Sequence, residues 1–326
     1  MVGSRSPACA GLLQLGRASV LLVLAGSIAR ADTPIDRPEA IEVDREAPPA
    51  GRIEFGFDGG APGSVWAAGI QLGYLDQPIT LHTTTRETHP VRRRETVALG
   101  GAFAFGPSFI VDARLPLAHQ VGDRLTGFGD DQPLDRWVLG DLALGARARV
   151  IESGPFSAFV RGLLTLPTGD DHNFAGDAKW SASWLLIGRA TLPMGIVIAA
   201  TGGIRLRGAE VTIADRLVGD ELAFGAGVIA PIPPIAHLWC DPQQVKLAAE
   251  VVGVLGDNIA HHRGPSPAEA RIGIVTQPSP ALTFGLRVGT ALDDQIGAPR
   301  FRAMLELAWH GPEPVAAPPA PASDEP

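Results

Sequence analysis

The feature that most constrains the fold of this chain is a repeated alternation of apolar residues with polar or very small ones. In the segment GDLALGARARV, residues 140–150, leucine, alanine and valine occupy one face of an extended chain, and Asp141, Arg147 and Arg149 lie on the other. The segments LTFGLRVGT and RFRAMLELAW repeat the pattern. A period of two residues is that of a β-strand, whose successive side chains point to opposite faces. These segments are therefore predicted to be strands with one apolar face.

The same pattern, interrupted by glycine and proline, predicts about twelve strands. They lie near residues 65–84, 94–105, 108–119, 137–150, 155–167, 178–192, 195–207, 218–231, 243–256, 268–277, 280–291 and 299–309. The turns GPS, ESGP, LPMG and QPSP are tight, the turn PIPPIAHLWCD is longer and proline-rich, and the alternate connections are mostly long and polar. Outer-membrane barrels have short periplasmic turns and long external loops. The sequence thus predicts an all-β fold, an antiparallel up-and-down transmembrane β-barrel.

A soluble β-sandwich or lipocalin-like barrel is the alternative fold. It would bury its apolar faces and cover its surface with lysine and glutamate. In this chain the non-apolar face is mostly glycine, alanine, serine, threonine and arginine, which suits a lumen. Aromatic residues also fall where the membrane interfaces are expected. The predicted periplasmic rim carries Trp66, Phe103, Phe105, Phe109 and Trp309, and the external rim carries Trp180, with Trp184 slightly further in.

The N-terminal residues 1–31 have the order of a secretory signal peptide. Basic residues come first, then a short apolar run, and the segment closes with Ala29-Arg30-Ala31. We therefore expect export and cleavage after Ala31. Residues 32–64 are expected to form an N-terminal periplasmic segment, 65–310 the barrel, and 311–326 a disordered Pro/Ala-rich tail.

Charge and cysteine content exclude several classes of partner and site. Removal of the predicted signal takes away three arginines and no acid, so the formal charge moves from −8 to −11. An acidic chain is a poor partner for nucleic acid. Cys9 would leave with the signal, so that Cys240 has no intrachain partner for a disulfide or a cysteine-based zinc site.

Four motifs resemble a known family when they are taken in order. LGDLALGARARV, RGLLTLPTGDDHNFAGD, VGDELAFGAGV and APRFRAMLELAW are similar to the transmembrane barrel of OmpA-family-like outer-membrane proteins of myxobacteria and related deltaproteobacteria. The resemblance covers roughly residues 65–309. It implies an outer-membrane location, contact with lipids, and recognition of the terminal aromatic by the barrel-assembly machinery. Many relatives continue into a peptidoglycan-binding domain, whereas this chain has only HGPEPVAAPPAPASDEP after Trp309.

The face opposite the apolar one is predicted to line a lumen that is rich in arginine. Its basic members are Arg114, Arg147, Arg149, Arg161, Arg189, Arg205, Arg207, Lys246, Arg271, Arg287 and Arg302, and its acids are Asp112, Asp141, Glu250 and Glu306. Rings of arginine favour anions in pores. We therefore expect a structural barrel or a passive pore for small, preferentially anionic solutes. Pairing of the arginines with acids in a plugged barrel is equally compatible with the sequence. The alternative function is a closed barrel that binds a surface partner through its long external loops.

The segment LPTGDDHNFAGD, residues 166–177, is the main candidate for a ligand site. Asp170, Asp171, Asn173 and Asp177 offer oxygen atoms that a hard cation would accept. Their spacing does not fit a calcium loop, and no phosphate-binding loop follows. Turn chemistry explains the residues more simply, as an external hairpin tip whose acids face the medium. The chain also lacks the G-x-S-x-G nucleophile motif. We expect a monomer that is not an enzyme, with no metal or other cofactor.

Overall fold

The computed structural model describes residues 34–35, 42, 65–82, 87–106, 108–123, 132–213, 216–232, 245–256, 266–279, 281–293 and 296–311. The chain divides into two compact units, Met1–Asp32 and Thr33–Pro326, and all of these residues belong to the second unit. The predicted signal peptide lies outside the described residues, as do most of the segment 32–64 and most of the tail.

Nearly all of the described chain is β-structure. The strands are β1 (Pro34–Ile35), β2 (Trp66–Asp76), β3 (Leu81–His82), β4 (Glu87–Thr88), β5 (Arg93–Phe105), β6 (Phe109–Gly122), β7 (Leu134–Leu139), β8 (Leu142–Ser153), β9 (Phe156–Leu166), β10 (Ser181–Thr191), β11 (Val197–Arg207), β12 (Glu210–Ile213), β13 (Arg216–Val218), β14 (Glu221–Pro231), β15 (Val245–Leu255), β16 (Ala268–Ser279), β17 (Leu282–Ala291) and β18 (Phe301–His310). Among the described residues, no helix is long and apolar enough to cross a membrane.

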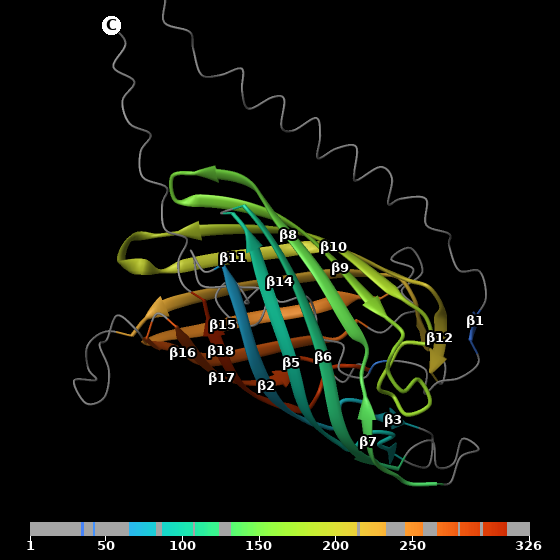
Figure 1. Cartoon of the computed structure of the whole chain (residues 1–326). Coiled ribbons are helices and arrows are strands. Elements are labelled where there is room, and N and C mark those ends of the chain that lie inside the picture. The colour runs from blue at the N-terminus through green and yellow to red at the C-terminus, as the bar shows by residue number, and fades with distance from the viewer. Residues whose placement is uncertain are drawn as a thin grey trace, which may run out of the picture. The chain divides into compact units, whose positions relative to one another are not determined.

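The long strands pair in antiparallel fashion into a closed barrel (Figure 1). β18 pairs with β2, β2 with β5, and β5 with β6, so the last strand of the chain meets the first. β7 and β8 both pair with β6 and form one wall strand that is interrupted at Gly140 and Asp141. With that pair counted as one, twelve strands form the wall in the described part of the chain. The predicted antiparallel barrel of about twelve strands is confirmed.

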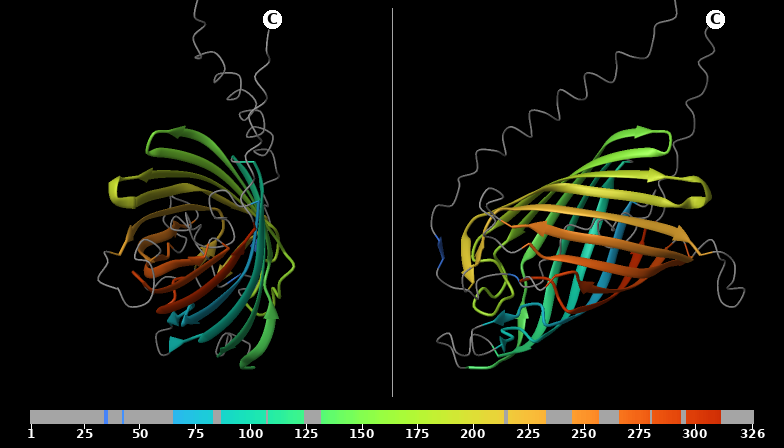
Figure 2. Two further views of the ribbon diagram at one scale, coloured as in Figure 1. Left: turned by 60° about the vertical axis from the view of Figure 1, so that its left-hand side comes forward. Right: turned by 180° about the vertical axis from the view of Figure 1, so that it is seen from behind.

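The two ends of the barrel differ in their connections (Figure 2). At one end, here called the turn end, β5 runs directly into β6, β8 into β9, and β16 into β17. The opposite end, here called the loop end, carries the longer connections, including residues 167–180 and the β12–β13 hairpin. The predicted division into tight turns and long loops is therefore present, and the predicted exception is the longer connection between β14 and β15, residues 232–244.

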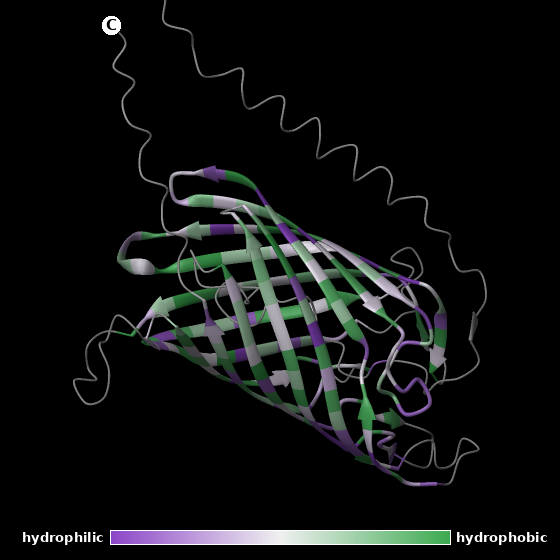
Figure 3. Cartoon of the chain, viewed as in Figure 1, coloured by the Kyte–Doolittle hydropathy of each residue, from purple (hydrophilic) through white to green (hydrophobic). Residues whose placement is uncertain are grey.

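The two faces of the wall have opposite chemistry. Large apolar side chains point outward and stay exposed, as Leu99 (56%), Leu186 (59%) and Ile272 (59%) show. Charged side chains on the same strands point inward and are buried, including Arg94 and Arg271. The alternation is visible as successive green and purple bands along the strands in Figure 3. This arrangement is the inverse of a soluble protein and matches a barrel whose outer face contacts lipid.

Aromatic side chains collect on the outer face near the turn end. Trp66, Phe103, Phe105, Phe109 and Trp309 are each 41–58% exposed. The Phe103 and Phe105 rings meet edge to face, with their centroids 4.9 Å apart. At the loop end Trp137, which the sequence analysis did not single out, is 62% exposed. The described aromatics thus mark both ends of the outward apolar face, as expected for interfacial girdles.

Three described residues of the segment 32–64 lie at the loop end. Pro34 and Ile35 in β1 pair in parallel with Glu210 and Val211 of β12. The Glu42 backbone N–H donates to Asp177 Oδ1 at 3.2 Å. β2 begins at the turn end with Trp66. The segment that was predicted to be periplasmic therefore has its described residues at the end opposite the start of the barrel.

Candidate functional site

The inward face of the barrel holds the charged residues that the sequence analysis assigned to a lumen. Five of the predicted arginines are buried, together with three of the predicted acids: Arg161, Arg205, Arg271, Arg287 and Arg302, and Asp141, Glu250 and Glu306. The Asp112 and Arg207 side chains are also buried. Arg114, Arg147, Arg149, Arg189 and Lys246 are half-buried, and Arg149 is paired with Glu152.

A chain of ion pairs runs across β15, β16, β17 and β18. Glu269 accepts hydrogen bonds from Arg271 at 2.9 Å and from Arg302 at 2.8 Å. Arg271 also lies 3.7 Å from Glu250, which in turn pairs with Arg287 at 3.4 Å. Burial of a charge is costly unless an opposite charge and hydrogen bonds compensate it. Each of these buried groups has such a partner.

A separate pair lies on the wall formed by β6, β8 and β9. Arg161 donates to Asp112 across 2.9 Å, and both side chains are buried. Arg161 comes from β9 and Asp112 from β6, with β8 between them. Gly145 of β8 faces this pair, and a Cβ atom there would lie 2.4 Å from the Asp112 carboxylate. The small residue in the middle strand is what lets the two charges meet.

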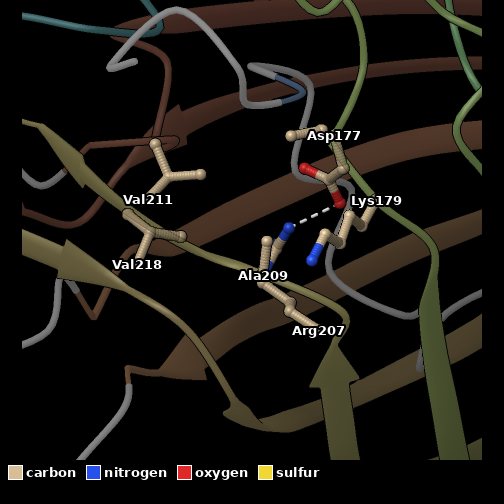
Figure 4. Close-up of a pocket in the computed structure, with 7 residues that line it drawn as sticks. Asp177, Lys179, Arg207, Ala209, Val211 and Val218 are labelled. Carbon is tan, nitrogen blue, oxygen red and sulfur yellow. Dashed lines mark hydrogen bonds and ion pairs between the residues drawn. The ribbon is translucent and has the colours of Figure 1, made fainter. Parts of the chain in front are cut away.

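A third network lies near the loop end. Arg205 pairs with Glu221 at 3.3 Å, and Arg207 lies 3.5 Å from the same carboxylate. Arg207 also donates to Asp177 at 2.6 Å (Figure 4). Arg207 and Asp177 border a small pocket of about 10 Å³, lined also by Ala178, Lys179, Ala209, Val211 and Val218, which is room for about one water molecule.

Arg94 and Glu42 extend this third network toward the N-terminal segment. The Arg94 side chain is 1% exposed and forms an ion pair with Glu42. Its guanidinium also donates to the Phe174 carbonyl at 3.3 Å. At the mouth of the barrel, Arg94 thus connects three parts of the chain: the wall strand β5, the 167–180 connection, and Glu42, which precedes the barrel.

The ion pairs change the electrostatic picture of the lumen. A surplus of arginine was predicted for the lumen because Glu42, Asp177, Glu221 and Glu269 were not among the predicted inward acids. Each of these acids pairs with one or more of the buried arginines Arg94, Arg205, Arg207, Arg271 and Arg302. Glu221 and Glu269 lie near the starts of β14 and β16, and Glu269 alternates with Arg271 at the strand period. That spacing was the available signal for Glu269.

The segment LPTGDDHNFAGD folds into the mouth of the barrel instead of forming a solvated tip. Asn173, Phe174 and Ala175 are at most 2% exposed. Phe174 belongs to an apolar cluster, here called the mouth cluster, with residues from three other connections at this end and with Leu134 at the start of β7. Its members are Ile79, Leu81, Val91, Leu134, Phe174, Val211, Ile213, Val218 and Ile296. The segment is mostly polar, so its composition gave no indication that Phe174 would be buried in an apolar cluster.

Asp141 fastens both ends of this segment. Its Oδ1 accepts from the Gly169 N–H and its Oδ2 from the Asp177 N–H, each at 2.8 Å. A Cβ atom at Gly169 would lie 2.9 Å from Oδ1, so only glycine allows this approach. Asp141 lies in the break between β7 and β8, outside the strands. Burial raises the pKa of its carboxyl to about 6, against the lowering effect of the two N–H donors.

The four candidate cation ligands do not act as one group. The Asp170 and Asp171 carboxylates and the His172 ring have ligand atoms within 4.8 Å of one another. Asn173 instead donates from Nδ2 to Asp170 at 2.7 Å, and Asp177 is directed toward Arg207. Asp170 also accepts from the His172 backbone N–H. These contacts are those of a local turn, in which the Asp side chains bond to nearby backbone.

Comparisons with known proteins identify the fold. No protein-family model matches the sequence, and no curated protein matches it. Among solved structures, an outer membrane channel from Pseudomonas putida F1 superposes with a TM-score of 0.53 and 12% identity, over 76% of this chain and 96% of that one. The NanC porin gives 0.50 and 7%, over 75% and 99%. The chain therefore has the closed twelve-strand fold of porin-like outer-membrane barrels.

Proposed function

We propose that this chain is an outer-membrane β-barrel pore for small solutes, with the loop end outside. The observation that carries the proposal is the combination of an exposed apolar outer face with an inward face of paired charges. Charges placed inside a barrel serve either to fill it or to guide solutes, and the similar folds in the comparisons are channels and porins. The lumen side chains described above are its proposed selectivity residues.

We assign any preference for anions to the turn end of the lumen. Arg189 and Lys246 lie on the inward face close to that end, and Arg147 lies on the same face at the centre of β8. Basic side chains in a pore favour anions. A mild anion preference is expected, because the paired networks contribute little net charge.

Reversal potentials in planar bilayers test this assignment. In a salt gradient, Arg189→Gln/Lys246→Gln is expected to bring the ratio of anion to cation permeability close to 1, since two inward cations are removed. Arg93→Gln is the matched control, because this arginine is 46% exposed and pairs with Glu95 outside the lumen. An unchanged ratio in the double variant would contradict the assignment, and the absence of any current from folded protein would contradict the pore itself.

A surface-binding module is the second candidate function. The observation in its favour is the mouth cluster, which gives the loop end a folded surface instead of separate loops. A binding module would retain its function in a barrel that conducts nothing. Conductance therefore separates the two candidates. The enzyme alternative is not proposed, since no nucleophile motif is present in the sequence.

The remaining parts of the proposal concern location and partners. Export by a cleaved signal, folding by the barrel-assembly machinery, contact with outer-membrane lipids and a monomeric state are expected as before. Membership of the OmpA-family-like barrels of myxobacteria is supported by the order of the four motifs in residues 65–309. With the loop end outside, Glu42 and β1 would lie at the external mouth instead of in the periplasm.

A further inference from the structure

The connection between β9 and β10 is attached to the barrel in a way that differs from a hairpin loop. The β9–β10 ladder ends at Thr165 and Ser181, and beyond it residues 167–177, here called the mouth loop, have no strand partner. Four hydrogen bonds hold the base of this loop. Asp141 accepts from Gly169 and Asp177, the Leu139 carbonyl accepts from Asp170 at 2.9 Å, and Thr168 Oγ1 accepts from the Leu142 N–H at 2.8 Å.

The middle of the mouth loop is held by side-chain insertion. Phe174 is fully buried in the mouth cluster, and its backbone φ of 58° lies in the left-handed region. Aromatic residues rarely adopt that conformation without support from their surroundings. Ala175 packs with Ala118 and Val138 of the wall in a second small cluster. The carbonyl of Phe174 accepts from Arg94, which is itself an inward-facing residue.

These contacts make the mouth loop a cover that is distinct from the wall. The barrel strands are joined by continuous ladders, whereas the loop is held by separate hydrogen bonds at its base, by burial of Phe174 and Ala175, and by contacts with two arginines of the wall, Arg94 and Arg207. Displacement of Phe174 would leave every wall ladder intact and would separate the loop from the other connections that meet in the mouth cluster. Local units with few contacts open at a lower free energy than the body of a fold.

We propose that the mouth loop is a hinged cover of the external mouth, held shut by Asp141 and Phe174, and that its opening controls passage through the lumen. This inference rests on the proposed pore function. In the closed position Arg94, Glu42 and the Phe174 carbonyl meet at the mouth. Opening breaks the bonds that Asp141, Arg94 and Arg207 make with the loop and withdraws the Phe174 ring, while the twelve-strand wall stays closed.

Single-channel recording with variants of the cover tests the proposal. Asp141→Asn replaces one of two carboxylate oxygens, each of which accepts a backbone N–H, by an NH2 group that can only donate, and Phe174→Ala removes the inserted ring. Each is expected to raise the open probability roughly 10-fold or more, the scale set by hydrogen bonds to charged groups and by burial of an aromatic ring. The matched controls are Asp135→Asn, with an exposed acid at the same end, and Phe284→Ala, with a ring on the outer face. Both controls are expected to conduct as the unaltered protein does.

A cross-link tests the opposite change, in which the mouth loop is held closed. It does not depend on destabilising substitutions. Val138→Cys/Ala175→Cys, in a Cys240→Ser background, places thiols in one buried cluster within reach of a short bifunctional reagent. Cross-linking is expected to lower the open probability at least 10-fold, and a reducible reagent should restore it on reduction. Replacement of residues 169–176 by a Gly-Ser turn should give a permanently open channel.

The outcomes distinguish failure of the proposed cover from failure of the proposed pore function. Equal currents from the unaltered protein, the cover variants and the cross-linked form would overturn the cover and leave the pore standing. No current from any of them, with the Gly-Ser replacement included and with folding verified, would overturn the proposed pore and the cover with it. Increased current in the cover variants together with suppression by the cross-link would support both.

Discussion

Replacement of Glu269 by leucine is expected to destabilise the folded barrel by about 3–5 kcal/mol, the usual cost of removing one partner from a buried ion pair. Glu269 is 5% exposed and accepts hydrogen bonds from two arginines, Arg271 and Arg302. Arg271 would keep Glu250 at 3.7 Å, but Arg302 would lose the carboxylate that accepts from its Nε at 2.8 Å. The measurement is urea unfolding of protein inserted in phospholipid vesicles, with the midpoint and slope compared between variants.

The control for this prediction is Glu152→Leu. Glu152 is also paired with an arginine, but its side chain is 60% exposed, so its removal should cost no more than about 1 kcal/mol. A second comparison adds Arg302→Met to Glu269→Leu. Because Arg302→Met removes the buried positive charge that Glu269 had compensated, part of the lost stability should return. Similar losses for Glu269→Leu and Glu152→Leu would show that the inward network is solvated and does not behave as a buried one.

Leu99→Arg is expected to cost about 2–4 kcal/mol, as charged substitutions do on the lipid face near the bilayer midplane. Leu99 lies at the centre of β5, between Arg93 and Phe105, and is 56% exposed on the outer face. In a soluble protein an arginine at so exposed a position would be nearly neutral. The effect therefore reports on the lipid contact and can be followed by the same vesicle unfolding assay.

Leu292→Arg is the matched control for the lipid-facing variant. Leu292 is 57% exposed, almost the same as Leu99, but it follows β17 at the loop end. The cost there should fall to about 0–1 kcal/mol, as near the membrane interfaces. If Leu99→Arg proved as mild as Leu292→Arg, the outward apolar face could not be in contact with hydrocarbon.

The strand pattern could be predicted from the sequence because it depends only on local alternation. In β18, Arg302, Met304, Glu306 and Ala308 were assigned to one face, and the structure buries all four. The position of each strand in the wall follows from chain order in an up-and-down barrel, so the topology required no long-range information. The interruption at Gly140 and Asp141 was not predicted, because its cause is the mouth loop and not the strand itself.

The pairing of charges across the lumen could not be predicted in the same way. Glu269 and Arg302 come from β16 and β18, with β17 between them, so their contact depends on the register of two ladders. Arg94 stands in the run VRRRE, and only its phase relative to Thr96 and Ala98 indicates that it faces inward. Partners such as Glu42 lie outside the alternating segments, where the period of two gives no guidance.

The mouth loop shows where composition alone misleads. Its glycines and acidic residues are typical of a solvated turn, and several of its hydrogen bonds are indeed those of a turn. Its folded position depends on Phe174 reaching residues of other connections, which approach one another only in the closed barrel. The one available signal was an isolated aromatic residue inside a polar loop.

Electrophoretic migration of protein extracted from outer membranes, with and without boiling, is the most direct test of a closed barrel in the outer membrane. A closed β-barrel held by continuous strand ladders should resist the detergent until it is heated. The unboiled protein is expected to migrate faster than the boiled protein, because the folded barrel is compact. Recovery in the soluble fraction, or identical migration before and after boiling, would contradict a closed barrel that spans the outer membrane.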